Sequence, residues 1–290
     1  MKNLYCFYIA CFAVILHIDP LLAIDLQPGE VRAPKPGINF LQLSYQISER
    51  GNRYQQGEKL PGSPEIDVAQ FIMRLGHSFQ VAEYPALAYV QVPVGYTHPG
   101  GSLSTQTGDS GFGDTTVMLA IWPYANRETQ TYFGLGSYLT LPSGSYSAER
   151  SFNMGQNRYS SAFQIGFQRP IIGSLTGMVA LDATLYADND EFGVKRATLK
   201  QDVLYTGQAG LRYDFSAQYS MAATYLYTSG GETSVYGVNR DDTIGLNRYQ
   251  LSAIANFSFG RLTLQYGGDL KTENSFIENN RWIFRYTWLF

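Results

Sequence analysis

The last ten residues, 281–290, most strongly constrain what this chain can fold into. They read Arg-Trp-Ile-Phe-Arg-Tyr-Thr-Trp-Leu-Phe, so every even-numbered position is aromatic. Successive side chains of a β-strand point to opposite faces, which gives one aromatic face and one face with two arginines. A membrane β-barrel turns such an aromatic face to lipid and keeps the polar face in a wet lumen. The alternative is a buried edge strand of a soluble sandwich. The aromatic positions are Trp282, Phe284, Tyr286, Trp288 and Phe290.

The composition fits a barrel better than a helical membrane protein. Charged residues make up only 16% of the chain and hydrophobic residues 44%, yet no apolar run after residue 23 is long enough for a spanning helix. In a barrel, apolar and polar residues alternate along each strand, and this alternation hides the membrane signal from averages. The formal net charge of −3 argues against nucleic acid as a partner.

Residues 1–23 have the pattern of a secretory signal peptide. Lys2 supplies the positive start, residues 4–18 the apolar core, and Ala23 the expected cleavage point. The alternative is an N-terminal membrane anchor, for which the apolar run is short. Both cysteines, Cys6 and Cys11, lie inside this peptide, so the mature chain is expected to form neither a disulfide nor a thiolate metal site. Residues 24–36 are predicted to be a short periplasmic segment and residues 37–290 the barrel.

The mature chain reads as a succession of strands with period-two alternation. In the first, Leu41, Leu43 and Tyr45 share one face and Gln42 and Ser44 the other. Pro93, inside the third run, predicts a bulge or a local break because proline cannot donate to a sheet ladder. Strands are expected near residues 38–50, 66–79, 84–97, 114–123, 131–141, 159–168, 175–186, 199–214, 219–228, 248–259, 261–271 and 281–290.

Long and short connections alternate between these strands. Long polar loops are predicted near 50–65, 98–113, 142–157, 188–197, 229–243 and 272–280, and short turns near 80–84, 124–130, 169–174, 215–217 and 259–261. Lipid cannot hydrogen-bond an open sheet edge, so the last strand must pair with the first. We therefore predict an all-β protein, a single antiparallel up-and-down transmembrane β-barrel of about 12 strands in the bacterial outer membrane, with short periplasmic turns and longer extracellular loops.

Charged residues on the inward faces are the candidates for a lumen lining. Mixed charges of this kind either pair across strands and brace the wall or select ions. Since both signs occur, no strong ion preference is expected. The candidates are Arg74, Asp182, Lys200, Asp202, Arg212, Arg248, Asp269, Arg281 and Arg285.

Three short motifs stand out: Pro36-Gly37-Ile38-Asn39, Gly111-Phe112-Gly113-Asp114 and Leu141-Pro142-Ser143-Gly144. Gly111 and Gly113 permit positive φ or close packing at the barrel rim, and Asp114 either caps that turn or faces the lumen. Pro142 and Gly144 end a strand and allow a turn.

In their order and spacing, these motifs resemble a family of outer-membrane proteins named after the meta-pathway of phenol degradation. The resemblance covers nearly the whole mature chain, and the family more often has Thr where Ser143 stands. It implies a barrel for uptake of hydrophobic or aromatic compounds. The terminal strand also resembles the closing strand of bacterial outer-membrane barrels, which implies recognition by the barrel-assembly machinery.

No enzyme site is expected. A serine–histidine site needs a histidine near a serine and an orienting group, and the mature chain has only His77 and His98. No catalytic, cofactor-binding or metal-ligating residue is predicted. The favoured function is passive diffusion of small molecules, hydrophobic or aromatic compounds among them. The alternatives are a structural or adhesive barrel with a plugged lumen, or a barrel lipase. The expected partners are outer-membrane lipids, the assembly machinery and a small solute.

Overall fold

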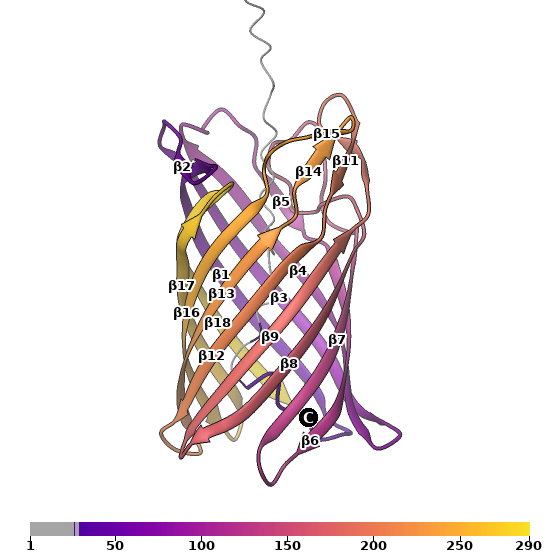
Figure 1. Ribbon diagram of the computed structural model, residues 1–290, viewed down its shortest axis with the longest axis vertical. Coiled ribbons are helices and arrows are strands. Elements are labelled where there is room, and N and C mark those ends of the chain that lie inside the picture. The colour runs from indigo at the N-terminus through magenta and orange to yellow at the C-terminus, as the bar shows by residue number, and fades with distance from the viewer. Residues whose placement is uncertain (1–25, 27–28) are drawn as a thin grey trace, which may run out of the picture.

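Twelve antiparallel strands form a closed barrel in the computed structural model, which describes residue 26 and residues 29–290. Figure 1 shows the strands tilted steeply around a common axis. The predicted signal peptide, residues 1–23, lies outside the described residues. The wall consists of β1 (Asn39–Gln55), β3 (Pro64–Val81), β4 (Tyr84–Gly101), β6 (Thr115–Asn126), β7 (Thr131–Leu141), β8 (Ser160–Ile172), β9 (Leu175–Tyr186), β12 (Leu204–Asp214), β13 (Tyr219–Gly230), β16 (Ile244–Phe257), β17 (Gly260–Thr272) and β18 (Phe276–Leu289).

The barrel closes between β18 and β1, the last and first strands. Their antiparallel ladder runs from Phe40 opposite Leu289 to Ser48 opposite Arg281. At its lower end, the backbone groups of Asn39 and Phe290 bond to each other at 2.8 and 2.9 Å. This pairing removes the two open edges that lipid would leave unsatisfied, and it confirms the predicted closure.

Alternation along the strands separates a lipid face from a lumen face. In β1, Gln42 and Ser44 are buried in the lumen, whereas Tyr45 points outward and is 47% exposed. In β18, Arg281 is buried and Phe284 is exposed on the outer surface. Outward apolar side chains of this kind are covered by lipid in a membrane barrel. The described residues include no helix of the length and apolarity needed to cross a membrane.

The connections alternate as predicted, with one exception. The short turns lie at the end of the barrel that holds the C-terminus and the longer loops at the other end (Figure 1), which identifies these ends as periplasmic and extracellular. Residues 272–280, however, do not form a long loop, because β17 ends at Thr272 and β18 starts at Phe276. This prediction is wrong because the polar residues of the segment continue the strand, where β18 pairs with β1 up to Phe276 opposite Arg53.

A small sheet stands above the barrel on the extracellular side. It consists of β10 (Asn189–Phe192), β11 (Ala197–Gln201), β14 (Thr233–Val235) and β15 (Val238–Asn239). The single strand predicted at 199–214 is therefore wrong. The chain breaks between β11 and β12, because Leu199 is buried in this small sheet and pairs with Val235.

The irregularity predicted at Pro93 lies in the pairing on one edge of β4, while β4 itself continues through Pro93 and pairs with β3 there without a register shift. Strand β4 pairs with β6 up to Gln91 opposite Thr116, and then with the short strand β5 (Asp109–Phe112) from Val94 onward. At the switch, Gly113 donates its N–H to the carbonyl oxygen of Pro93 at 2.9 Å. Proline has no N–H to offer a neighbour, so it occupies the position where β4 changes partner. A second short strand, β2 (Glu58–Lys59), folds back on the end of β1.

An engineered disulfide can test the register of the ladder between β1 and β18. Gln42 and Thr287 are opposite each other and both face the lumen, with Gln42 Nε2 donating to Thr287 Oγ1 at 3.0 Å. Opposed residues of an antiparallel pair lie about 4.5–5.5 Å apart, within disulfide range. The double variant Gln42→Cys/Thr287→Cys should form a cross-link on oxidation, seen as a mobility shift in non-reducing electrophoresis of the denatured protein. Leu41→Cys/Thr287→Cys, whose side chains lie on opposite faces, is the matched control. Equal cross-linking in both variants would contradict this register.

Candidate functional site

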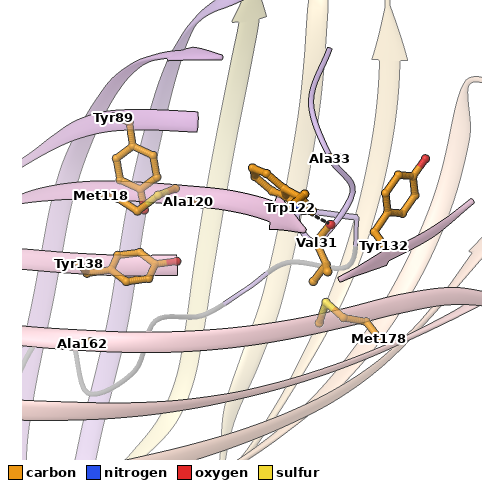
Figure 2. Close-up of a cluster of buried hydrophobic side chains, with 10 residues drawn as sticks. All are labelled: Val31, Ala33, Tyr89, Met118, Ala120, Trp122, Tyr132, Tyr138, Ala162 and Met178. Atoms are coloured by element: carbon orange, nitrogen blue, oxygen red, sulfur yellow. Dashed lines mark hydrogen bonds between the residues drawn. The ribbon is translucent and has the colours of Figure 1, made fainter. Parts of the chain in front are cut away.

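The N-terminal segment, residues 26 and 29–36, lies inside the lumen. Val31 and Ala33 are almost completely buried, 3% and 2% exposed, against the inner faces of β4, β6, β7, β8 and β9. Figure 2 shows Val31 between Trp122 and Met178, with the chain crossing the interior of the barrel. The prediction of a periplasmic segment at 24–36 is therefore wrong for the described residues, because an apolar patch on the inner wall offers them a buried position.

Polar contacts hold the N-terminal segment along its length. Trp122 donates its indole N–H to the carbonyl oxygen of Val31 at 2.7 Å, and this bond is buried. Closer to the periplasmic end, Arg127 donates to the carbonyl oxygen of Pro34 at 2.7 Å. The segment also contacts β3, where the Arg74 guanidinium lies 3.8 Å from the Glu30 carboxylate. Backbone carbonyls buried in the lumen need such donors, so the barrel wall and the segment complement each other.

Apolar residues on the inner face of β6 are the sequence feature that could have predicted the lumen position of the N-terminal segment. Inward positions of a water-filled barrel are expected to be polar, but β6 places Met118, Ala120 and Trp122 there. Period-two alternation along residues 114–123 by itself puts Met118 and Ala120 on the inward face. An apolar run on a lumen face indicates a covered surface, and here the cover is the N-terminal segment.

The opposite part of the wall carries a charged cluster formed by Arg50, Arg248, Asp269, Glu278 and Arg281. Glu278 is central and only 1% exposed. Its carboxylate lies 3.1 Å from Arg248, 3.5 Å from Arg281 and 3.7 Å from Arg50. Arg248 also donates its Nε–H to Asp269 at 2.7 Å. Removing one member of such a buried network leaves the others uncompensated, so these residues act as a unit.

Irregularities in three neighbouring ladders build the charged cluster. The register shifts between Glu49 and Arg50 in β1, and between Asn247 and Arg248 in β16. The ladder between β17 and β18 ends at Gly267 opposite Arg281. Beyond that point, the Asp269 carboxylate accepts the backbone N–H of Glu278 at 2.8 Å. Bulges re-aim side chains, and these turn the charged residues inward.

The predicted lumen charges fall into two groups. Most of them lie on wall strands, and two lie outside the barrel. Lys200, on β11, is 64% exposed and pairs with Asp188 at 3.4 Å, and the exposed Asp202 follows it in the connection to β12. Their predicted place in the lumen is wrong because the chain leaves the wall before them. On wall strands are Arg74, Asp182, Arg212, Arg248, Asp269, Arg281 and Arg285.

Among the wall residues, the contacts differ. Arg212 pairs with Asp214 on its own strand at 2.8 Å, and Arg285 donates to the hydroxyl of Ser44 across the closing ladder at 3.1 Å. Arg74 donates to Gln91 Oε1, while Asp182 is buried beside Gln164. The contacts of Arg74, Asp182 and Arg285 join adjacent strands, one of the two roles expected from mixed charges, whereas the contact of Arg212 stays within β12.

Two of the sequence motifs meet at the extracellular end of the lumen. The Asp114 carboxylate accepts the backbone N–H groups of Gly144 at 2.8 Å and Gln156 at 2.7 Å. A side chain at Gly144 would collide with Asp114 Oδ1 and with the Cα atom of Gly155, both 2.8 Å from the Cβ position. Glycine at 144 is therefore required for close packing, and Asp114 acts as a clamp on the chain that follows β7.

The other motif residues shape the same junction. Gly111 has a φ of +146°, a conformation that favours glycine. Gly113 packs against Pro93, whose Cγ atom would lie 2.8 Å from a Cβ at 113. Pro142 directly follows the end of β7, where proline cannot continue the ladder. Burial raises the pKa of the Asp114 carboxyl, while the two N–H groups that donate to it act to lower the pKa.

The clamped chain is the mouth loop, residues 142–159, which folds into the extracellular mouth. Phe152 is buried against Ile66 and Val68 of β3 and Phe276 of β18. A second aspartate, Asp109, accepts the backbone N–H of Met154 at 3.0 Å and the hydroxyl of Ser145 at 3.1 Å, and pairs with Arg150. The mouth loop is therefore held by two buried carboxylates and by an apolar anchor.

A cavity of about 170 Å³ lies between the two structures that occupy the lumen. The N-terminal segment contributes Leu26 and Glu30, and the mouth loop contributes Met154 and Gln156. The wall contributes, among other residues, Arg74, Tyr89, Tyr138, Arg248, Arg281 and Arg285. Among the residues that the structure describes, no group of three or more His, Cys, Asp or Glu side chains is placed to hold a metal ion. Because the cavity lies inside the closed wall, between the N-terminal segment and the mouth loop, it is the candidate functional site.

The clamp predicts how the mouth loop responds to substitution. Asp114→Ala should leave two partly buried N–H groups without this acceptor, at up to about 1–3 kcal/mol each, and so loosen the loop. Limited trypsin digestion of the folded barrel should then cut faster after Arg150. Asp188→Ala, at an exposed loop aspartate that pairs with Lys200, is the matched control and should digest like the parent protein. Unchanged digestion of Asp114→Ala would refute the clamp.

Two solved structures place this geometry among known proteins. The COG4313 outer membrane channel from Pseudomonas putida F1 superposes with a TM-score of 0.89 and 29% identity, over 92% of this chain and 100% of that chain. The beta domain of the Bordetella autotransporter Brka superposes with a TM-score of 0.51 and 11% identity, over 88% of this chain and 100% of that chain. The second likeness concerns the fold alone. None of the curated proteins compared with this sequence matches it.

A family match covers residues 50–285 of the chain, most of the barrel. It agrees with the resemblance carried by the glycine and proline motifs at 111–114 and 141–144. Together with the closed barrel and its similarity to the COG4313 outer membrane channel, it places the protein in the bacterial outer membrane. The chain belongs to the family described as "Putative MetA-pathway of phenol degradation".

Proposed function

We propose that this protein is an outer-membrane channel for small molecules, hydrophobic or aromatic compounds among them. The observation that carries the proposal is the similarity to the COG4313 outer membrane channel, at 29% identity over 92% of this chain. A closed wall with an internal cavity of about 170 Å³ supports it. The family description, which refers to phenol degradation, favours aromatic solutes.

In this proposal, the N-terminal segment is the inner gate of the channel. Its apolar contacts come from only three side chains, Leu26, Val31 and Ala33, and single hydrogen bonds rather than a strand ladder connect it to the wall. A short segment without secondary structure of its own belongs to the least stable parts of a fold, so it can leave the wall without unfolding the barrel. The specific alternative is a permanently plugged barrel, which the same buried contacts also support.

We propose no enzymatic activity for the protein. His77 pairs with Ala88 near the periplasmic end, whereas His98 pairs with Asp67 near the extracellular end. Positions 67 and 77 of β3 lie about 30 Å apart along the strand, from a rise of roughly 3.3 Å per residue. The Nδ1 atom of His77 is 2.8 Å from the Asn39 side chain. Neither histidine lines the cavity in the lumen, and this placement argues against a serine–histidine hydrolase at that site.

We further propose that the aromatic face of β18 is the assembly signal, recognised by the barrel-assembly machinery. Deletion of Phe290 combined with Trp288→Ser removes two exposed rings from the end of the closing strand. The amount of folded barrel in the outer membrane should fall several-fold, as expected from a loss of about 1–2 kcal/mol. Heat-modifiable mobility of membrane fractions measures this amount. Ile171→Ser, at an exposed position next to a periplasmic turn, is the control, and normal levels of the double variant would contradict the proposal.

Single-channel conductance in planar bilayers tests the gate. Deletion of residues 26–36 should enlarge the conductance of the refolded barrel, because the lumen loses its inner obstruction. Trp122→Phe keeps an aromatic, though smaller, side chain and loses the indole N–H that donates to the carbonyl oxygen of Val31. It should increase the frequency of opening, whereas Trp288→Phe on the outer face should not. Silence of both the parent protein and the deletion variant, in correctly folded form, would refute the channel proposal. Conductance of the deletion variant alone would indicate the plugged barrel.

A further inference from the structure

Two buried polar groups on the inner wall have no hydrogen-bond partner. Tyr132 of β7 and Gln168 of β8 lie directly opposite each other in the ladder between these strands, and the two residues are 0% and 6% exposed. Among the residues that the structure describes, nothing bonds to the Tyr132 hydroxyl or to the Gln168 amide oxygen. Nearly all buried polar groups in proteins are hydrogen-bonded, so an unpaired couple of this kind indicates a place for a polar group of a ligand.

The apolar surface beside these two groups is the surface on which the N-terminal segment lies. Met178 of β9 is opposite Gln168, and it belongs to the same buried cluster as Trp122 and Val31 (Figure 2). The wall residue under Val31 is a glycine, because a Cβ atom at Gly166 would lie only 3.2 and 3.3 Å from the two Val31 methyl carbons. Glycine at 166 therefore lets a branched apolar group lie directly on the backbone of the wall.

We propose that this part of the wall binds a small neutral molecule that carries one hydroxyl on an apolar body. The hydroxyl donates to the Gln168 amide oxygen and accepts from the Tyr132 hydroxyl, and the apolar body takes the place of Val31. The assignment rests on the proposed channel function for the route by which the molecule arrives. It names the solute class and the two residues that select it. This hydroxyl site consists of Trp122, Tyr132, Gly166, Gln168 and Met178.

The two unpaired groups differ in what they can accept and donate. An amide oxygen only accepts hydrogen bonds, whereas a tyrosine hydroxyl can also donate one. A solute hydroxyl matches both, because it donates to the first and accepts from the second. A hydrocarbon would leave both groups unpaired. A carboxylate accepts only, and an unpaired charge on an apolar surface is unfavourable. The chemistry of the pair therefore favours a neutral hydroxyl compound.

The N-terminal segment and the solute exclude each other at the hydroxyl site. Val31 covers Gly166, and its carbonyl oxygen accepts the indole N–H of Trp122. The docked segment leaves the Tyr132 hydroxyl and the Gln168 amide oxygen unpaired, whereas a hydroxyl solute pairs both. A ligand that binds one of two states better shifts the population toward that state. The solute therefore opens the inner gate that blocks its own path.

Thiol labelling of a cysteine on the N-terminal segment measures the release of that segment. Ala33 is 2% exposed, and the natural cysteines, Cys6 and Cys11, precede the expected mature N-terminus. The variant Ala33→Cys thus gives the mature barrel a single, buried thiol. A maleimide reacts with this thiol when the segment has left the wall, so the labelling rate reports the open fraction. Heat-modifiable mobility verifies that the barrel is folded.

Three probes share one methylated ring and differ only in their oxygen. Toluene has no oxygen, 4-methylanisole has an ether oxygen without a hydrogen, and p-cresol has the full hydroxyl. The free concentration that doubles the labelling rate should be about three- to tenfold lower for p-cresol than for toluene, as expected from one net hydrogen bond. The value for 4-methylanisole should lie closer to that of toluene. Equal values for p-cresol and toluene, or no effect of any probe, would overturn the proposal.

Substitution of the two polar residues assigns the preference to the hydroxyl site. In the Ala33→Cys background, Tyr132→Phe and Gln168→Met should each abolish the advantage of p-cresol over toluene. Since the Tyr132 hydroxyl has no partner in the closed barrel, Tyr132→Phe should not speed labelling in the absence of solute. Tyr213→Phe, on the outer face, is the matched control and should keep the advantage. An advantage that survives in either site variant, or faster labelling of Tyr132→Phe without solute, would refute this site.

Conductance in planar bilayers separates this inference from the channel proposal. Release of the N-terminal segment is measured without passage of the solute through the barrel. A barrel whose segment is released by p-cresol but that stays silent in the bilayer retains the hydroxyl site and loses the channel. A barrel that conducts, but whose labelling responds equally to p-cresol and toluene, retains the channel and loses the hydroxyl site.

Discussion

Closure of the sheet between β1 and β18 is the constraint on which the rest of the structure depends. In lipid, each unpaired backbone N–H or C=O at an open edge costs several kcal/mol. The ladder between β1 and β18, from Phe40 to Ser48, removes that cost. Two backbone hydrogen bonds between Asn39 and Phe290 extend the ladder to Phe290. Once the barrel is closed, every inward side chain belongs to one enclosed space. The cavity, the charged cluster and the docking site of the N-terminal segment all follow from this enclosure.

Enclosure gives the inward residues three different tasks. Glutamines and serines of β1 keep the wall polar, Trp122 and its apolar neighbours bind the N-terminal segment, and the arginines around Glu278 create a charged wall. Buried charges are retained only when they are paired and hydrogen-bonded. The bulges at Arg50 and Arg248 show that the regular ladder is sacrificed to satisfy this requirement. The functional asymmetry of the lumen therefore has its origin in departures from regular strand pairing.

The obstructed lumen separates this barrel from a simple pore. The N-terminal segment narrows it from the periplasmic side and the mouth loop from the extracellular side, with the cavity between them. Asp109 and Asp114 fasten the mouth loop through the backbone N–H groups of Met154 and Gln156, contacts that do not depend on the side chains at these two positions. The glycines at 144 and 155 are needed because two backbones touch there. Both obstructions are short segments, which makes selective passage compatible with a rigid wall.

The sequence by itself determined the all-β class, the outward and inward faces, the closing strand and the positions of most turns. These features depend on local alternation and on residues such as Pro93, whose effects on the backbone act within a few positions. The prediction of a single strand at 199–214 was wrong. The alternating pattern continues through residues 202–203, where the small extracellular sheet separates β11 from β12. The polar stretch 272–280 was read as a loop, although Glu278 lies in the wall at the centre of an ion-pair cluster.

Only the tertiary structure decided which inward residues share one site. Arg285 and Tyr138 are far apart in sequence and are brought to one cavity by the closure of the sheet. The lumen position of Val31 and the meeting of Asp114 with Gly144 likewise depend on contacts between distant parts of the chain. The physical reason is that alternation specifies the face of a residue, whereas its neighbours across the lumen depend on the register, the bulges and the segments that fill the barrel.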